Sequence, residues 1–156
     1  MPKKTYNEKL NSPGGLPKIE DISGNLKSVA MYGGDKLLVA APLQYNEIMA
    51  KIPEGKVITA DKIRAYLAEK AGADGTCKLT AGIFINTCAH AGAERGDDKF
   101  PYWRTLKMKG ELNEKYPGGI DGHKTLLESE GHIIVQKGSR YYVQNYESVL
   151  VDLNRI

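Results

Sequence analysis

The apolar residues of this chain occur in short runs that proline and glycine separate, and each run predicts one short element. The run at residues 36–41 predicts a strand or an extended segment. Pro42 follows it and can open a helix that runs to about Lys51. The partial apolar stripe of this helix consists of Leu43, Ile48 and Met49.

A pair of helices is expected next. Thr59 is a good N-cap for a helix over residues 60–70, and Gly72 and Gly75 break the pattern before a second helix over residues 79–94. We expect this second helix to be buried on much of its circumference through Leu79, Ile83, Phe84, Ile85, Cys88 and Ala89. Two helices joined by a short break have the outline of a helix-turn-helix. The outline alone is weak evidence for DNA binding, because many helix pairs bind no DNA.

The pattern after residue 101 predicts a third helix and a hairpin. Residues 102–108 are expected to be extended, and residues 120–130 to form a helix. Two apolar runs at 132–135 and 141–143 flank a turn of Lys137, Gly138 and Ser139, which is a hairpin signal. A last short helix is expected over residues 146–153.

A hairpin directly after a third helix is the wing of a winged helix-turn-helix. Lys137 and Arg140 at its tip suit phosphate, although a solvated turn carries the same residues, and both interpretations stay open. Residues 1–30 are polar and broken by prolines, so they predict an irregular arm. The predicted fold class is mainly α with small β: a winged helix-turn-helix DNA-binding domain at 43–156 with a C-terminal β-hairpin, after an irregular N-terminal arm at 1–42.

Composition narrows the classes of protein that remain. With 156 residues, 41% of them hydrophobic, the chain can bury one core. The net charge of +3 leaves binding to nucleic acid open without demanding it. No apolar run approaches the roughly 20 residues of a membrane span, and the N-terminus lacks the apolar core of a secretory signal. We therefore expect a cytoplasmic protein of bacterial type, nucleoid-associated when bound to DNA, with no membrane partner.

The cysteines and histidines carry no sign of a metal or redox site. Cys77 and Cys88 lie in or beside an Ala-rich helical stretch, where a free thiol packs as a small hydrophobe. The three histidines are scattered, and no His or Cys cluster has metal-ligand spacing. The sequence therefore indicates no metal and no other cofactor.

Four runs in the middle of the chain together resemble one known family. They are IPEGKVIT at 52–59, the helix from Leu79, FPYWRT at 100–105, and YPGG at 116–119 followed by Lys124 and LLESEG at 126–131. In this order and spacing they resemble the DNA-binding domain of the methylated-DNA–protein-cysteine methyltransferases, the alkylguanine-DNA alkyltransferases, over about half of the chain. The resemblance implies that the helix from about Lys78 enters a groove of DNA.

The resemblance also implies that the alkyl-transfer chemistry of the family is lost. The acceptor cysteine falls on Tyr102 and its histidine base on Trp103, while the glutamate of the family is kept as Glu130. A phenol, with an ordinary pKa of about 10, is a poor acceptor of alkyl groups, and an indole cannot act as a base. The chain resembles the alkyltransferase-like subgroup that lacks the acceptor cysteine, so we expect no enzymatic activity.

Two residues that the family uses to flip its target nucleotide are missing as well. The tyrosine that helps to rotate the phosphate aligns with Ala60, and the arginine that fills the vacated stack aligns near Ile85 or Asn86. Flipping requires something to replace the lost stacking. An apolar wedge could do so, as in other DNA binders; the alternative is that no base is flipped.

The resemblance and the basic residues together supply the candidate contacts. The residues expected to contact DNA are Thr59, Lys62, Lys78, Thr80, Asn86, Arg104, Lys137 and Arg140. The residues expected to form a base or lesion pocket are Tyr102, Trp103, Tyr116, Gly118 and Gly119. The rings of Tyr102 and Trp103 could stack on a base, although Trp103 is explained equally well as core packing.

The function expected from the sequence is a non-catalytic, alkyltransferase-like protein that binds double-stranded DNA. It would recognise alkylated or otherwise modified bases in DNA repair, and a repair protein is a possible second partner. The alternative is a winged-helix module that binds DNA or protein without lesion recognition. A third, less favoured interpretation is an active methyltransferase that uses Cys77 or Cys88.

Overall fold

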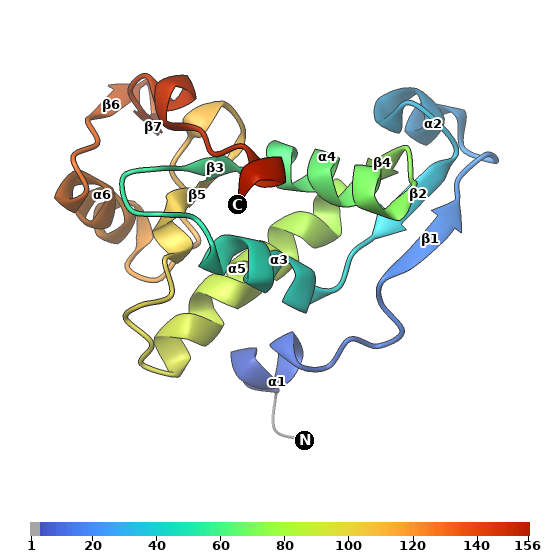
Figure 1. Ribbon diagram of the computed structural model, residues 1–156, viewed down its shortest axis with the longest axis horizontal. Helices are drawn as coiled ribbons and strands as arrows, with labels where there is room; N and C mark the ends of the chain where they lie inside the picture. Colours follow the sequence, from blue (N-terminus) through green and yellow to red (C-terminus); the bar gives the residue numbers. More distant parts are fainter. Residues whose placement is uncertain (1–3) are drawn as a thin grey trace.

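The computed structural model describes residues 4–156, in which it places six α-helices, seven short strands and four single 3-10 turns (Figure 1). The helices are α1 (Tyr6–Leu10), α2 (Leu26–Tyr32), α3 (Pro42–Ala50), α4 (Ala60–Ala71), α5 (Lys78–Glu94) and α6 (Gly119–Ser129). The strands are β1 (Lys18–Asp21), β2 (Lys36–Val39), β3 (Ile58–Thr59), β4 (Gly75–Thr76), β5 (Thr105–Leu106), β6 (Ile134–Lys137) and β7 (Arg140–Val143). The 3-10 turns are η1 (Tyr102–Arg104), η2 (Met108–Gly110), η3 (Tyr146–Val149) and η4 (Leu153–Arg155).

Helices α4 and α5 form the expected helix-turn-helix. Gly72 ends α4 in the left-handed conformation at φ 71°, which glycine adopts without a steric penalty. The turn continues through β4, which pairs in parallel with β2 and so fixes the break between the two helices to the rest of the domain. The predicted bounds of both helices are confirmed to within one residue at each end.

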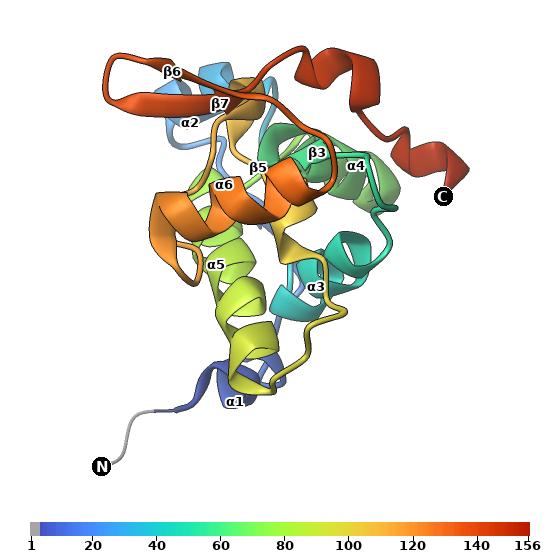
Figure 2. The ribbon, with the colours of Figure 1, turned by 90° about the vertical axis from the view of Figure 1, so that its left-hand side faces the viewer.

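The predicted wing is confirmed. Strands β6 and β7 pair antiparallel from Ile134 with Val143 to Lys137 with Arg140, and Gly138, at φ 64°, begins the two-residue turn. A bridge from Glu111 to Tyr142 and a hydrogen bond of 2.9 Å from the Leu112 amide to the Tyr141 carbonyl attach the hairpin to the domain. Figure 2 shows the hairpin at one end of the molecule and α1 at the other.

Two core clusters lie on either side of the short segment η1. The first is buried beneath α3, α4 and α5, with Tyr45, Met49 and Ile63 fully enclosed. The second, under α6 and the wing, consists of Val57, Leu106, Leu112, Leu127 and Val143. Parallel pairing of β3 with β5 joins the two clusters. The chain therefore has a mainly helical core with small sheets at its margins, as the fold class predicted.

Three segments differ from expectation. The described part of residues 1–30 is not irregular, because it contains α1, β1 and α2, and β1 pairs with β2. The segment 102–108 is a 3-10 turn followed by β5 and η2 instead of one extended piece, and residues 146–153 hold 3-10 turns instead of a helix. The expectation that the arm ends at residue 42 stays a prediction, and residues 1–3 of that arm lie outside the described residues.

Candidate nucleic-acid interface

The outward face of α5 is apolar and open. Leu79 is 73% exposed and Ile83 is 52% exposed, with Gly82 exposed between them and Lys78 exposed at the start of the helix. The expectation that Leu79 and Ile83 are buried is therefore wrong. Apolar residues occur all round this helix, so sequence spacing could not show which stripe faces the core. The predicted burial of Ile85, Cys88 and Ala89 is confirmed, and Ala81 joins them in the core.

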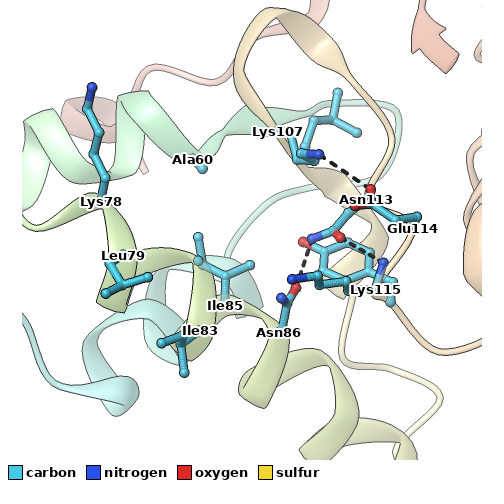
Figure 3. A pocket seen from close by; sticks show the side chains of 13 residues that line it. Ala60, Lys78, Leu79, Ile83, Ile85, Asn86, Lys107, Asn113, Glu114 and Lys115 are labelled. Carbon is cyan, nitrogen blue, oxygen red and sulfur yellow. Dashed lines mark hydrogen bonds and ion pairs between the residues drawn. The ribbon is translucent and has the colours of Figure 1, made fainter. Parts of the chain in front are cut away.

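A hollow of about 310 Å³ lies between this face of α5 and the segment from β5 to Tyr116 (Figure 3). Helix α5 contributes Lys78, Leu79, Gly82, Ile83, Ile85 and Asn86, and the opposite wall contains Leu106, Lys107, Asn113, Glu114, Lys115 and Tyr116, with Ala60 completing the lining. The hollow is thus mainly apolar along the helix, where Lys78 and Asn86 are the polar residues, and its opposite wall carries two lysines, one amide side chain and one carboxylate. Lys78, Asn86 and Tyr116 are the sequence-predicted site residues that the structure brings together here.

A chain of hydrogen bonds fixes the polar wall. The Asn113 side chain donates to the Asn86 side-chain oxygen at 2.9 Å, and its own oxygen accepts from the Lys115 amide at 2.9 Å. The Asn113 amide donates to Nδ1 of His123 at 3.0 Å. Asn113 and His123 were not predicted as site residues, because neither stands in a recognisable motif.

His123 is fully buried and neutral. Its Nδ1 accepts a hydrogen bond, so its Nε2 carries the proton and donates to the Trp103 carbonyl at 2.8 Å. Burial lowers the pKa of His123 to about 4, because the imidazolium would lose its hydration, and the Trp103 carbonyl only partly opposes this shift. The ring thereby ties the polar wall of the hollow to η1.

Three aromatic rings gather where η1 meets this wall. The Tyr102 ring packs edge-on against both Trp103, at 5.5 Å between centroids, and Tyr116, at 5.3 Å. Tyr116 is 3% exposed and its hydroxyl donates to the Thr105 carbonyl at 2.8 Å. Tyr102 and Trp103 are half-buried, packed on the first and second core respectively, and neither lines the hollow beside α5. Among the three rings, only Tyr116 lines it.

Gly118 and Gly119 shape the backbone behind Tyr116. They have φ of 82° and 66°, a region that side chains rarely adopt, and a Cβ on Gly118 would lie 3.2 Å from the Cα of Gly122. These two glycines turn the chain from the hollow into α6. Their role in the structure is therefore backbone geometry, and contact with a base stays a prediction.

Arg104 is engaged in an internal ion pair, which does not favour its prediction as a DNA contact. Its guanidinium donates to both carboxylate oxygens of Glu130, with an Nη2–Oε2 distance of 2.6 Å, and to the Ile52 carbonyl at 2.7 Å. Burial raises the pKa of Glu130, but the hydrogen bonds from Arg104, the nearby Trp103 indole and the charge of Arg104 outweigh it, so the pKa is lowered overall. The indole N–H of Trp103 is buried and makes no hydrogen bond of ordinary geometry.

The structure does not favour Thr59 as a DNA contact either. It is 1% exposed, within β3, because the short parallel pairing with β5 buries the start of α4. Lys62 is exposed, but it lies beside the C-terminal segment 150–154 and not at the hollow. Thr80 is half-buried and its hydroxyl donates to the Cys77 carbonyl at 3.5 Å.

The two wing residues are exposed. The ammonium group of Lys137 lies 5.6 Å from the centre of the Tyr142 ring, and Arg140 approaches the Glu111 carboxylate at 3.5 Å. A second hollow of about 200 Å³ connects the wing to the hollow of α5, since Lys107 and Glu114 line both and Ser139 and Arg140 line the wing side. The candidate surface thus runs from Lys78 across Lys107 to the wing.

Burial argues against Cys88 as a relocated nucleophile. Cys88 is fully buried, its thiol donates to the Pro42 carbonyl at 3.5 Å, and burial raises its pKa to about 12. Cys77 is half-buried at the start of α5, and both cysteines are free. Within residues 4–156, no three His, Cys, Asp or Glu side chains are arranged to hold a metal ion. In the same part of the chain, no helix is long and apolar enough to cross a membrane.

Comparison with known proteins identifies the fold. No protein-family model and no curated protein sequence matches this chain. Two solved structures match with a TM-score of 0.52, each over 71% of this chain and 94% of its own: S. pombe Atl1 with damaged DNA containing O6-carboxymethylguanine, at 21% identity, and S. pombe ATL with DNA, at 22% identity. The chain therefore has the helix-turn-helix fold of these alkyltransferase-like structures.

Proposed function

We propose that this chain is a non-catalytic, alkyltransferase-like protein that binds double-stranded DNA and recognises a modified base. The observation that carries the proposal is the hollow beside the exposed face of α5, in a fold shared with a protein solved on damaged DNA. A recognition helix beside an open hollow can hold a displaced base, and the exposed Ile83 side chain can act as the apolar wedge that replaces it in the stack.

The walls of the hollow suit a nucleobase. The apolar side chains of α5 offer surface for contact with a base, and the Tyr116 ring, 3% exposed, offers only its edge. The side chains of Asn86 and Asn113, together with Lys115, offer polar groups that could read the edge of a base. We place the modified base in this hollow, against Tyr116, and not against Tyr102 and Trp103.

The proposed binding is not accompanied by alkyl transfer. At the acceptor position stands Tyr102, whose pKa is raised by burial, so its phenolate is disfavoured. The neighbouring Trp103 supplies no base, and the thiol of Cys88 is held protonated. Incubation with DNA that contains O6-methylguanine, followed by intact-mass measurement, should leave the mass of the protein unchanged. A gain of one methyl group would contradict the proposal.

The second candidate is general DNA binding without lesion recognition, which the exposed lysines of α5 and the wing favour. Gel shifts of a plain duplex and an O6-methylguanine duplex, each at two salt concentrations, separate the two functions. Equal affinity for both duplexes would support the second candidate. Absence of binding at low salt would exclude both candidate functions and favour a module that binds another protein. As a DNA-binding protein, the chain would act in the cytoplasm, at the nucleoid.

A further inference from the structure

Helix α1 is docked on α5 instead of trailing from the domain. Glu94, at the end of α5, accepts hydrogen bonds from the amides of Tyr6 and Asn7 at 3.1 Å each and from the Asn7 side chain at 2.7 Å. The Asn7 side chain also donates to the Ala91 carbonyl and accepts from Arg95 at 2.6 Å. These bonds, made mostly through one carboxylate, hold α1 across the last turns of α5 (Figure 2).

Further contacts orient the docked segment. The Tyr6 ring stacks on the His90 ring at 4.8 Å between centroids and 21° between planes, and Leu10 is 3% exposed within the first core. Hydrogen bonds from Asn7 lower the pKa of Glu94, so its carboxylate stays charged at neutral pH. The position of α1 is thus determined by an apolar anchor, a ring stack and a charged acceptor.

This docking sets two lysines beside the candidate DNA surface. Lys4 and Lys9 line a hollow of about 230 Å³ together with Ile83, Phe84 and Thr87 of α5. Ile83 lines this hollow and the larger one described above, so the two hollows adjoin along one face of the helix. The basic residues of the arm therefore continue the surface that starts at Lys78.

We propose that the docked N-terminal segment is a second DNA-contacting element, in which Lys4 and Lys9 bind the phosphate backbone of the duplex that α5 contacts. The inference rests on the proposed DNA binding and assigns a partner to a region with no role in that proposal. Charge supports duplex DNA as the occupant, since lysines beside an apolar recognition face match a phosphate backbone flanking a groove.

The test compares duplex affinity across salt concentrations for the whole chain and two double variants. The variant Lys4→Gln/Lys9→Gln should bind roughly 10-fold more weakly at about 0.1 M salt, with a logarithmic salt slope smaller by about 1.8, because each phosphate contact contributes about 0.9. The matched control Lys51→Gln/Lys70→Gln removes the same charge at two exposed sites, one directly after α3 and one in α4, that line neither hollow. The control should change the slope by much less.

A third variant, Glu94→Ala, separates docking from charge. It removes a negative charge, which alone would strengthen DNA binding, but it releases α1, so we expect weaker binding. Unchanged binding by the Lys4/Lys9 variant, or binding by Glu94→Ala as tight as that of the unaltered chain, would overturn the inference while the proposed function stands. If the unaltered chain binds no duplex at low salt, the proposed function fails and this inference fails with it.

Discussion

The side chains of Arg104 and Glu130 are joined by three hydrogen bonds of 2.6, 3.0 and 3.1 Å, and both side chains are largely buried at 15% and 6% exposure. The arginine also reaches the Ile52 carbonyl, at the start of the segment that leads into α4. One ion pair therefore connects η1, the end of α6 and the entry to the helix-turn-helix. Its role is to hold the scaffold of the site together, with Nε, Nη1 and Nη2 of Arg104 each donating to a partner inside the protein.

Breaking this pair should destabilise the fold without changing how the folded protein binds DNA. Arg104→Met leaves a buried carboxylate unpaired, so we expect the free energy of unfolding to fall by about 3–5 kcal/mol in urea titration at neutral pH. The affinity of the folded variant for duplex DNA should stay within about twofold of the unaltered chain. A stable Arg104→Met protein with much weaker DNA binding would instead make Arg104 a phosphate ligand.

His123 should make the stability of the protein fall in mild acid. Its pKa is lowered from 6.5 to about 4 in the folded state, so the unfolded chain binds a proton at a higher pH than the folded one. The stabilisation from the neutral ring is therefore fully present above pH 6.5 and is lost as the pH falls toward about 4. Between about pH 7 and about pH 5 this loss amounts to roughly 2 kcal/mol.

The measurement compares the chain with His123→Gln, which cannot be protonated. Carboxylates affect both proteins alike, so the difference in their free energies of unfolding isolates the histidine. That difference should shrink by roughly 2 kcal/mol from about pH 7 to about pH 5. A difference that stays constant over this range would mean that the pKa of His123 is not lowered in the folded protein.

Two faces of α5 should respond differently to truncation. Ile83→Ala removes an exposed side chain and should change stability by no more than about 0.5 kcal/mol, while lowering affinity for DNA. Ile85→Ala, two residues along the same helix, opens a cavity in the core and should cost about 2–5 kcal/mol. Urea titration and anisotropy on both variants check this. If Ile83→Ala binds DNA as tightly as the unaltered chain, the exposed face of α5 is not part of the DNA interface.

Tyr102 should be a packing residue and not the contact to the base. Tyr102→Ala removes the ring between Trp103 and Tyr116, so we expect a loss of roughly 3 kcal/mol in stability. Tyr102→Phe should leave the stability nearly unchanged, because the Tyr102 hydroxyl makes no hydrogen bond to the described residues. Discrimination between lesion and plain DNA should survive in Tyr102→Phe and be reduced in Tyr116→Ala. If discrimination is instead lost in Tyr102→Phe and kept in Tyr116→Ala, the modified base is bound at Tyr102.

The sequence predicted local elements well and side-chain environments less well. Thr59, Gly72 and Gly75 delimit the helix pair, and Lys137-Gly138-Ser139 marks the hairpin, because start, stop and turn signals depend on neighbouring residues. The solvent exposure of Leu79 and Ile83 could not be predicted from the sequence, since α5 carries apolar residues on all sides. Their exposure depends on what the rest of the chain leaves uncovered.

Long-range partners account for the other differences. From sequence, Arg104 was predicted to bind phosphate. In the structure it pairs with Glu130, which lies 26 positions away in the sequence. The arm lacks a periodic pattern, yet α1 is ordered by Glu94, which lies 87 positions from Asn7. His123 likewise gains its role only from Asn113 and the Trp103 carbonyl. A single residue in the sequence does not reveal such partners. For this reason the predicted site residues differ from the structure more than the predicted fold does.

The most direct test of the central claim is the ratio of affinities for two duplexes of identical sequence, one with a single O6-methylguanine and one with guanine at that position. Anisotropy competition at fixed salt measures this ratio, with Ile85→Val as a folded control altered in the core. Contact of the modified base with the hollow predicts at least about fivefold tighter binding to the lesion, equivalent to about 1 kcal/mol. A ratio of one, with DNA binding otherwise intact, would contradict the claim that this hollow recognises a modified base.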